Sequence, residues 1–339
     1  MTDAVVSQVN LRDRHSMDAV DSLLCREGLH REKNLDYVCA VFDEDSRAIA
    51  TGSCAGNTLR CFAVSREHQG EGLLNQVLSH LISVQTSRGN IRLFLYTKPD
   101  TARFFGDLGF HEIARVTDRM VFMENRRGGF NSYLAGLGGT AKSGISAAIV
   151  MNANPFTLGH QYLAEQASAA CDTLHLFVVS EDVSLFPFSV RRRLVSEGVR
   201  HLPNVILHDC GPYIISQATF PSYFLPDEET VSEVQARLDL AVFCRIAKAL
   251  HITERWVGEE PANAVTRLYN QVMAEELPKS GIRCREIPRR LANGTPVSAS
   301  TVRRCIKTGD FHAIEQLVPQ TTLDYLLSPE AAEILKNSD

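Results

Sequence analysis

Short apolar runs alternate with longer amphipathic stretches along the first 125 residues of the chain. Three runs are separated by acidic and Gly-Asn turns, so they predict successive strands at residues 37–42, 48–54 and 59–65. Apolar positions at helical spacing then predict a helix over 72–87, followed by a strand at 91–96 and a short helix at 101–108. This part therefore predicts an α/β unit.

The second half repeats the alternation with strands that are apolar on both faces. The runs predict strands at residues 145–151, 173–179, 205–207, 255–257 and 283–287, with amphipathic helices between them. Such a pattern is typical of a doubly wound, Rossmann-like parallel sheet. Ligands of these sheets bind at the carboxyl ends of the strands, so we expect the site at those ends.

A glycine-rich stretch separates the two halves. Residues 126–144 contain six glycines in nineteen positions, which predicts a flexible linker. A chain of 339 residues is also long for one compact domain. The expected domains are residues 1–125 and 145–339, joined by the linker at 126–144.

Composition narrows the class of protein. A hydrophobic content of 44% and a charged content of 22% are typical of a globular protein. No apolar run is long enough to span a bilayer, and the first ten residues lack a signal pattern. A net charge of −5 disfavours nucleic-acid binding. Nine cysteines without zinc spacing predict reduced thiols, no metal site and a cytoplasmic location.

The strongest local signal is I-V-M-N-A-N-P-F-T-L-G-H, in which a strand, a turn and a helix start follow one another. Backbone N–H groups and the positive end of the helix dipole would suit nucleotide phosphates there. His160 could donate a hydrogen bond to a phosphate oxygen, and Thr157 opens the helix. We assign these two residues to catalysis and the following to ATP binding: Asn152, Asn154, Pro155, Phe156 and Gly159. The alternative is an ordinary capped helix with a solvated histidine.

Two later segments add to the predicted phosphate site. Gly258 ends a predicted strand, in W-V-G-E-E-P, and would let the nucleoside approach the backbone. The run S-A-S-T-V-R opens a late helix, where hydroxyls, free amides and a guanidinium could bind an anion. Its ATP-binding candidates are Ser298, Ser300, Thr301 and Arg303. Helix capping alone is the simpler reading of this run. Arg191 is a further candidate phosphate contact.

The first half carries its own glycine loop. His-Gln-Gly-Glu-Gly-Leu-Leu follows a predicted strand and opens a helix, and this arrangement could hold a pyrophosphate. The loop and the later A-R-F-F-G-D-L-G-F resemble the GCN5-related N-acetyltransferase (GNAT) fold. The resemblance implies binding of a CoA-like group by Gln69, Gly70 and Gly72. Phe105 stands where that family commonly has a tyrosine general acid, and phenylalanine transfers no proton.

Taken in order, the C-terminal motifs resemble the nucleotidylyltransferases of the T/H-x-G-H type. The further motifs N-x-N-P-F-T-L-G-H, Y-I-I-S-Q-A-T-F-P-S-Y-F-L, G-E-E-P and I-P-R look like those of the citrate lyase ligase family. The resemblance covers nearly the whole chain. It implies ATP-dependent acetylation of the thiol on citrate lyase's acyl carrier (gamma) subunit, which bears a dephospho-CoA-derived group. ATP with Mg²⁺, acetate and this carrier would be the reactants, and acetyl adenylate the intermediate.

Two other functions stay open at this point. The acetate:carrier-protein ligase of malonate decarboxylase shares the chemistry and differs in its protein partner. An adenylyltransferase for a small molecule would lack a protein substrate, and the additional first half disfavours it.

Overall fold

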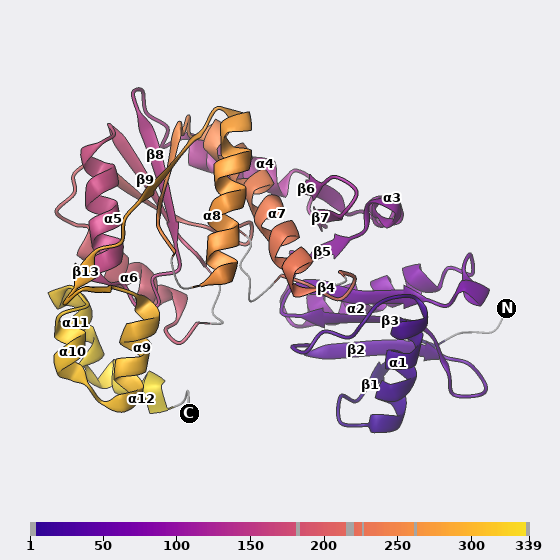
Figure 1. Cartoon of the computed structure of the whole chain (residues 1–339). Helices are drawn as coiled ribbons and strands as arrows, with labels where there is room; N and C mark the ends of the chain where they lie inside the picture. The colour runs from indigo at the N-terminus through magenta and orange to yellow at the C-terminus, as the bar shows by residue number, and fades with distance from the viewer. Residues whose placement is uncertain (1–4, 181–183, 215–219, 226, 261–262, 337–339) are drawn as a thin grey trace. The chain divides into compact units, whose positions relative to one another are not determined.

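The computed structural model describes residues 5–180, 184–214, 220–225, 227–260 and 263–336. The chain divides into two compact units (Figure 1). The first comprises Met1–Asn131 and Phe220–Leu238, and the second comprises Ser132–Thr219 and Asp239–Asp339. Both units are α/β, which confirms the predicted fold class.

The first unit contains a seven-stranded sheet in the order β1-β2-β3-β4-β5-β7-β6. Only β4 and β5 pair in parallel, and their pairing is limited to Thr58 with Phe94 and Leu59 with Leu95. The two strands therefore separate beyond Leu59, which leaves a fork in the middle of the sheet. The strands are β1 (Ser7–Val9), β2 (Tyr37–Phe42), β3 (Ala48–Ala55), β4 (Thr58–Val64), β5 (Phe94–Thr97), β6 (His111–Val116) and β7 (Met120–Glu124).

Helices α1 (Arg14–Arg26) and α2 (Leu73–Ser87) cover opposite faces of this sheet. Side chains alternate between the faces of a strand, so Val38 packs with α1 whereas Cys39 packs with α2. The remaining helices of this part are the short η1 (Arg66–His68) and α3 (Pro99–Asp107). Gly52 allows the close approach of α2, because a Cβ there would lie 2.6 Å from Val77 Cγ1.

The second unit is built on a parallel sheet in the order β10-β9-β8-β11-β12, as predicted. The strand order reverses at β8, which pairs with β9 over six residues but with β11 only at Ala147 and Ala148. The carboxyl ends of β8 and β11 thus separate at the switch point, where such sheets bind ligands. The strands are β8 (Ser146–Met151), β9 (Thr173–Val178), β10 (Val205–Asp209), β11 (Glu254–Gly258) and β12 (Arg283–Ile287).

One face of this sheet packs into a hydrophobic core of the second unit. Ala147, Ile149 and Met151 of β8 pack there with α5 (Leu158–Ala169), α6 (Phe188–Gly198) and α9 (Ala299–Thr308). The other elements are α4 (Gly129–Gly138), α7 (Glu228–Ala249), α8 (Ala264–Glu276), η2 (Leu277–Ser280), β13 (Leu291–Ala292), β14 (Thr295–Pro296), α10 (Phe311–Glu315), α11 (Gln320–Leu326) and α12 (Pro329–Lys336).

Two features differ from the expected organisation of the chain. The glycine-rich stretch at 126–144 contains helix α4, where a flexible linker was expected. Residues 220–238 group with the first unit, although they lie within the range expected for the second domain. All nine cysteines are free thiols, as predicted. Among the described helices, none is both long enough and apolar enough to cross a membrane.

Candidate active site

The start of α5 joins Thr157 and His160 in a reciprocal capping arrangement. Thr157 is the N-cap residue, and its Oγ1 accepts a hydrogen bond from the backbone N–H of His160 at 3.3 Å. In return, the backbone N–H of Thr157 donates to His160 Nδ1 at 3.0 Å. A histidine here replaces the Glu or Gln that usually completes a capping box. The imidazole therefore has a fixed orientation at the helix start.

These hydrogen bonds define which ring nitrogen of His160 carries the proton. A backbone N–H can only donate, so Nδ1 must be the accepting, unprotonated nitrogen of a neutral ring. Nε2 then carries the hydrogen and is available as a donor. Burial, and secondly the charge of Arg289, lower the pKa of His160 to about 4. His160 is consequently a neutral hydrogen-bond donor at pH 7.

The start of α9 lies beside α5 and contributes hydroxyls and a guanidinium. Ser298 Oγ caps the helix by accepting from the backbone N–H of Thr301 at 3.1 Å, and it lies 2.9 Å from Ser300 Oγ. Arg303 Nη1 donates to the carbonyl of Asn154 at 2.6 Å, which ties α9 to the turn after β8. Burial lowers the pKa of Arg303.

A cavity of about 340 Å³ lies between these helix starts and the carboxyl ends of β11 and β12. Seven of the predicted site residues line it together: Thr157, Gly159, His160, Gly258, Ser298, Ser300 and Arg303. The structure thus brings the three separate sequence signals to one place. It is the place that the parallel sheet favours for a ligand.

The other five predicted ATP-binding residues are not among those lining this cavity. Phe156 is fully buried and stacks on the His160 ring at a centroid distance of 5.7 Å. Asn154 Oδ1 accepts from the backbone N–H of Phe186, and Thr301 Oγ1 is hydrogen-bonded to Ser298. Asn152 is bonded to Ser184 and Arg191, and Pro155 is buried in the turn. The Asn154 carbonyl also accepts the hydrogen bond from Arg303. Through these contacts, the five residues hold the turn and the helix starts that surround the cavity.

The packing of α5 also explains why position 159 is a glycine. A Cβ at this position would lie 3.1 Å from the backbone oxygen of Val297, which is tighter than ordinary van der Waals contact. The glycine therefore lets α5 approach the segment that leads into α9. The group that approaches Gly159 closely in this structure is thus the backbone of Val297.

Arg191 is not a phosphate contact. Its side chain is fully buried, and its guanidinium donates to the carbonyls of Phe186, Asn152 and Val179 at 2.7–3.0 Å. These bonds tie the turn after β8 to the end of β9. The guanidinium of Arg191 is therefore used inside the fold and not at the cavity, which corrects the expectation from the sequence.

The cavity also contains residues that received no role from the sequence. Arg289 donates through Nε to the carbonyl of Glu259 at 2.5 Å and through Nη2 to the Glu260 carboxylate. Arg290, Asn263 and Tyr162 line the cavity as well. Arg289 is the last residue of the I-P-R motif. The motif therefore marked this residue, but the sequence did not show that it lines the cavity.

The electrostatics of this cavity suit a polyphosphate. Arg289, Arg290 and Arg303 supply positive charge, and the starts of α5 and α9 add the positive ends of their dipoles. Glu260 is the carboxylate at its lining. Within the described ranges, no three His, Cys, Asp or Glu side chains are grouped as a metal site would require.

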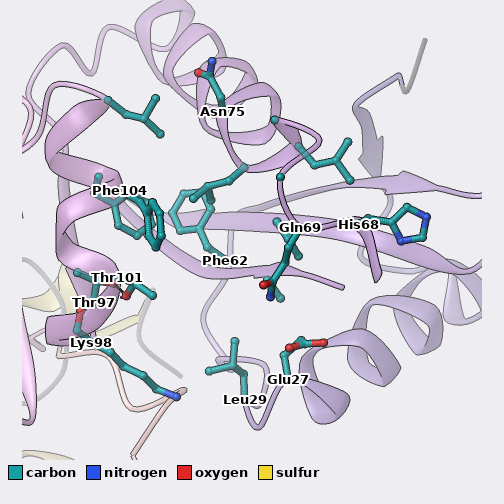
Figure 2. A pocket seen from close by; sticks show the side chains of 18 of the residues that line it. Glu27, Leu29, Phe62, His68, Gln69, Asn75, Thr97, Lys98, Thr101 and Phe104 are labelled. Atoms are coloured by element: carbon teal, nitrogen blue, oxygen red, sulfur yellow. Dashed lines mark hydrogen bonds between the residues drawn. The ribbon is translucent and has the colours of Figure 1, made fainter. Parts of the chain in front are cut away.

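The first unit holds a second cavity, of about 650 Å³, at the fork between β4 and β5 (Figure 2). Gln69, Gly70 and Gly72, which the sequence suggests for binding a CoA-like group, are among the residues that line it, and Phe105 contributes an apolar ring that contacts Phe62 edge-on. Gly70 and Gly72 adopt positive φ angles of 90° and 78°, which favours glycine in this loop. The loop leads directly into α2.

The parallel sheet, the Thr-x-Gly-His helix start and the arginine-lined cavity are consistent with a nucleotidylyltransferase-like domain in the second unit. Comparisons with known proteins agree with this class. Residues 146–326 match the family model of the citrate lyase ligase C-terminal domain. The chain is 40% identical to the [citrate [pro-3S]-lyase] ligase of Klebsiella pneumoniae, over 95% of this chain and 96% of that protein.

The protein of the same name from Escherichia coli strain K12 is 37% identical, over 95% of this chain and 93% of that protein. The chain belongs to the citrate lyase ligase family. Among solved structures, Escherichia coli ElaA is similar to 36% of this chain at 12% identity, over 99% of that protein, with a TM-score of 0.32. A GNAT acetyltransferase from Staphylococcus aureus is similar to the same extent of both chains, at 11% identity and a TM-score of 0.30.

Proposed function

We propose that this enzyme uses ATP to join acetate to the thiol on the citrate lyase acyl carrier subunit. The products are the acetylated carrier, AMP and diphosphate, and acetyl adenylate is the intermediate. The observation that supports this most is the neutral His160, whose Nε2–H is free to donate at a cavity lined by Arg289 and Arg303. Family membership supports the acceptor protein.

In the first step, an acetate oxygen attacks the α-phosphorus of ATP. The bond from that phosphorus to the bridging oxygen breaks, and diphosphate leaves with the electron pair. Acetate is already ionised at neutral pH, so the step needs orientation and charge stabilisation rather than a base. His160 Nε2–H, the first amides of α5 and α9, Ser300 and the two guanidinium groups would supply them.

Thr157 acts on this step through His160. Its Oγ1 and backbone N–H are both engaged in the capping arrangement, so we assign it a positioning role. Mg²⁺ would enter with ATP as the counter-ion of the phosphates, where it reduces their negative charge. Glu260, the carboxylate that lines the cavity, is paired with Arg289 and would have to exchange this partner to hold the ion.

In the second step, the carrier thiol attacks the carbonyl carbon of acetyl adenylate. A carbon–sulfur bond forms, the thiol releases its proton to solvent, and the carbon–oxygen bond to AMP breaks, so that AMP leaves with the electron pair. Nine free thiols favour a reducing compartment, and we propose that the reaction takes place in the cytoplasm.

We further propose that the fork cavity of the first unit binds the dephospho-CoA-like arm of the carrier. Its glycine loop presents backbone groups near the start of α2, where no side chain of the described residues caps the helix. Exposed amides of this kind suit a pyrophosphate. Phe62, Leu73, Leu74 and Phe105 give the rest of the cavity an apolar wall for the arm itself.

Exchange of labelled diphosphate into ATP tests the first step. We expect exchange that depends on acetate and needs no carrier. Exchange that requires a nucleotide acceptor in place of acetate would instead indicate a small-molecule adenylyltransferase. Adding the deacetylated carriers of citrate lyase and of malonate decarboxylase in parallel then identifies the acceptor, and we expect AMP release to be coupled to the citrate lyase carrier.

A further inference from the structure

Residues 220–225, hereafter the Tyr223 segment, are fixed in the first unit although they are remote in sequence from its sheet. The backbone N–H groups of Ser222 and Tyr223 donate to Glu32 Oε1, the latter at 2.9 Å. The backbone N–H of His30 donates to the Tyr223 carbonyl at 2.9 Å. Glu32 is itself 3.8 Å from the Arg60 guanidinium, which is buried. The backbone of the Tyr223 segment is therefore fixed by Glu32 through its N–H groups and by His30 through its carbonyl.

The side chain of Tyr223 occupies the fork between β4 and β5. Its hydroxyl donates to the backbone carbonyl of Tyr96 in β5 at 3.0 Å, and its side chain belongs to the same buried cluster as Cys61 and Ala63 of β4. The side chain thus bridges the two strands beyond Leu59, where their own pairing has ended. Only 5% of Tyr223 is exposed.

Tyr223 lines the same cavity as the glycine loop. Figure 2 shows His68 and Gln69 on one side of this cavity and Thr97, Lys98 and Phe104 on the other, with Phe62 between them. Tyr96, which accepts the Tyr223 hydrogen bond, directly precedes Thr97. The Tyr223 hydroxyl is therefore bonded on the β5 side of the cavity, where Thr97 and Lys98 lie, and a thiol that enters from the loop would approach it from the other side.

The phenol does not exchange protons with a ligand. Burial raises the pKa of Tyr223 far above its usual value, and its proton is used in the bond to Tyr96. Its contribution to the cavity is therefore steric.

We propose that Tyr223 is the end wall of the arm-binding cavity and determines which acyl group the bound arm can carry. With the ring in the fork, the cavity accepts an arm that ends in a free thiol or an acetyl thioester and excludes longer acyl chains. This inference rests on the proposed binding of the carrier arm in the first unit.

The test uses the full-length protein and isothermal titration calorimetry with dephospho-CoA and its acetyl and hexanoyl thioesters. For the wild type, we expect hexanoyl dephospho-CoA to bind at least tenfold more weakly than the acetyl form. Tyr223→Ala should reduce that ratio to threefold or less, because the fork is opened. Tyr223→Phe is the matched control, since it keeps the ring and should keep the wild-type ratio.

The outcomes separate this inference from the proposal on which it rests. If the wild type does not bind dephospho-CoA at all, arm binding in the first unit is wrong and the end wall with it. If dephospho-CoA binds and the wild type accepts both thioesters equally, the arm site stands and the end wall is wrong. If Tyr223→Ala keeps the wild-type ratio of acetyl to hexanoyl affinity, Tyr223 is likewise not the end wall. Tyr223→Leu replaces the alanine variant should thermal melting show that the latter is unfolded.

Discussion

His160 Nδ1 lies 3.0 Å from the backbone nitrogen of Thr157 and accepts its hydrogen. This bond directs Nε2, the protonated nitrogen, away from the helix cap. It also keeps a neutral ring in place at pH 7, because protonating Nδ1 would place two donors against each other. If diphosphate leaves at this point, as we propose, a neutral donor would stabilise the developing charge without holding the product as tightly as a cation would.

Replacing His160 with alanine should abolish most acetyl adenylate formation. The loss of one preorganised donor typically costs 10²–10³ in rate, so we expect acetate-dependent diphosphate exchange to fall by about that factor. The variant keeps the Thr157 cap and loses only the bond from the Thr157 backbone N–H to the imidazole, so the stability should fall by no more than about 1 kcal/mol, which thermal melting would register. Exchange within about threefold of the wild type would exclude His160 from catalysis.

Substituting Ser300 should affect ATP more than acetate. Its hydroxyl lines the cavity at the start of α9, near the predicted phosphates, whereas the neighbouring Ser298 is engaged in capping. Ser300→Ala should raise the KM for ATP several-fold and leave the KM for acetate unchanged. Ser298→Ala is the comparison, and its main effect should be lower stability, by about 1 kcal/mol. A raised KM for acetate alone in Ser300→Ala would contradict the assignment.

Arg289 should control the pH dependence of the first step. Burial is the larger cause of the lowered pKa of His160, and the positive charge of Arg289 adds to it by disfavouring the imidazolium form. Removing that charge in Arg289→Ala should therefore raise the pKa from about 4 only part of the way to the ordinary value of 6.5. The reaction needs the neutral ring, so the acidic limb of the exchange rate should move to higher pH.

The matched control for Arg289 is Arg285→Ala. Arg285 is paired with Glu254 and is not among the residues lining the ATP cavity. Its removal should leave the acidic limb where it is. A purely structural role for Arg289 would lower the rate at every pH without displacing the limb, and that result would count against the electrostatic role.

A carboxylate in the glycine loop of the first unit should interfere with the carrier arm. Gly72→Asp places a negative charge where we propose the pyrophosphate, so the KM for the carrier should rise at least tenfold. Gly72→Asn has nearly the same size and tolerates the positive φ angle equally well, and it should have a much smaller effect. Acetate-dependent diphosphate exchange should be normal in both variants. An unchanged KM for the carrier, with acetylation of amines by acetyl-CoA, would show instead a working acetyltransferase.

Local patterns were sufficient to predict most strands and the starts of α2, α5 and α9, because apolar periodicity and capping residues act within a few positions. Helix α1 and strands β1, β6 and β7 were not predicted. The parallel sheet followed from the alternation of strands and helices, and it brought Thr157, Gly258 and Ser298 to one cavity as expected. The start of α5 was predicted from Thr157, and the structure confirms it as the N-cap.

Contacts between distant residues could not be read in the same way. Arg191 was expected to face phosphates, but its guanidinium fills an internal site whose carbonyls come from three separate segments. Tyr223 binds Tyr96 across 127 positions, and residues 215–219 of the same motif lie outside the described part of the chain. Pro261 of G-E-E-P also lies outside it. Only the tertiary fold defines such partners.

The fate of the acetate oxygens tests the central claim, acetyl adenylate formation, most directly. Acetate labelled with ¹⁸O in both carboxylate positions is converted with ATP and the carrier, and the products are analysed by mass spectrometry. Attack on the α-phosphorus, followed by cleavage of the carbon–oxygen bond, should leave one ¹⁸O in each AMP and none in diphosphate. Unlabelled AMP, or ¹⁸O in the diphosphate, would contradict the acetyl adenylate route.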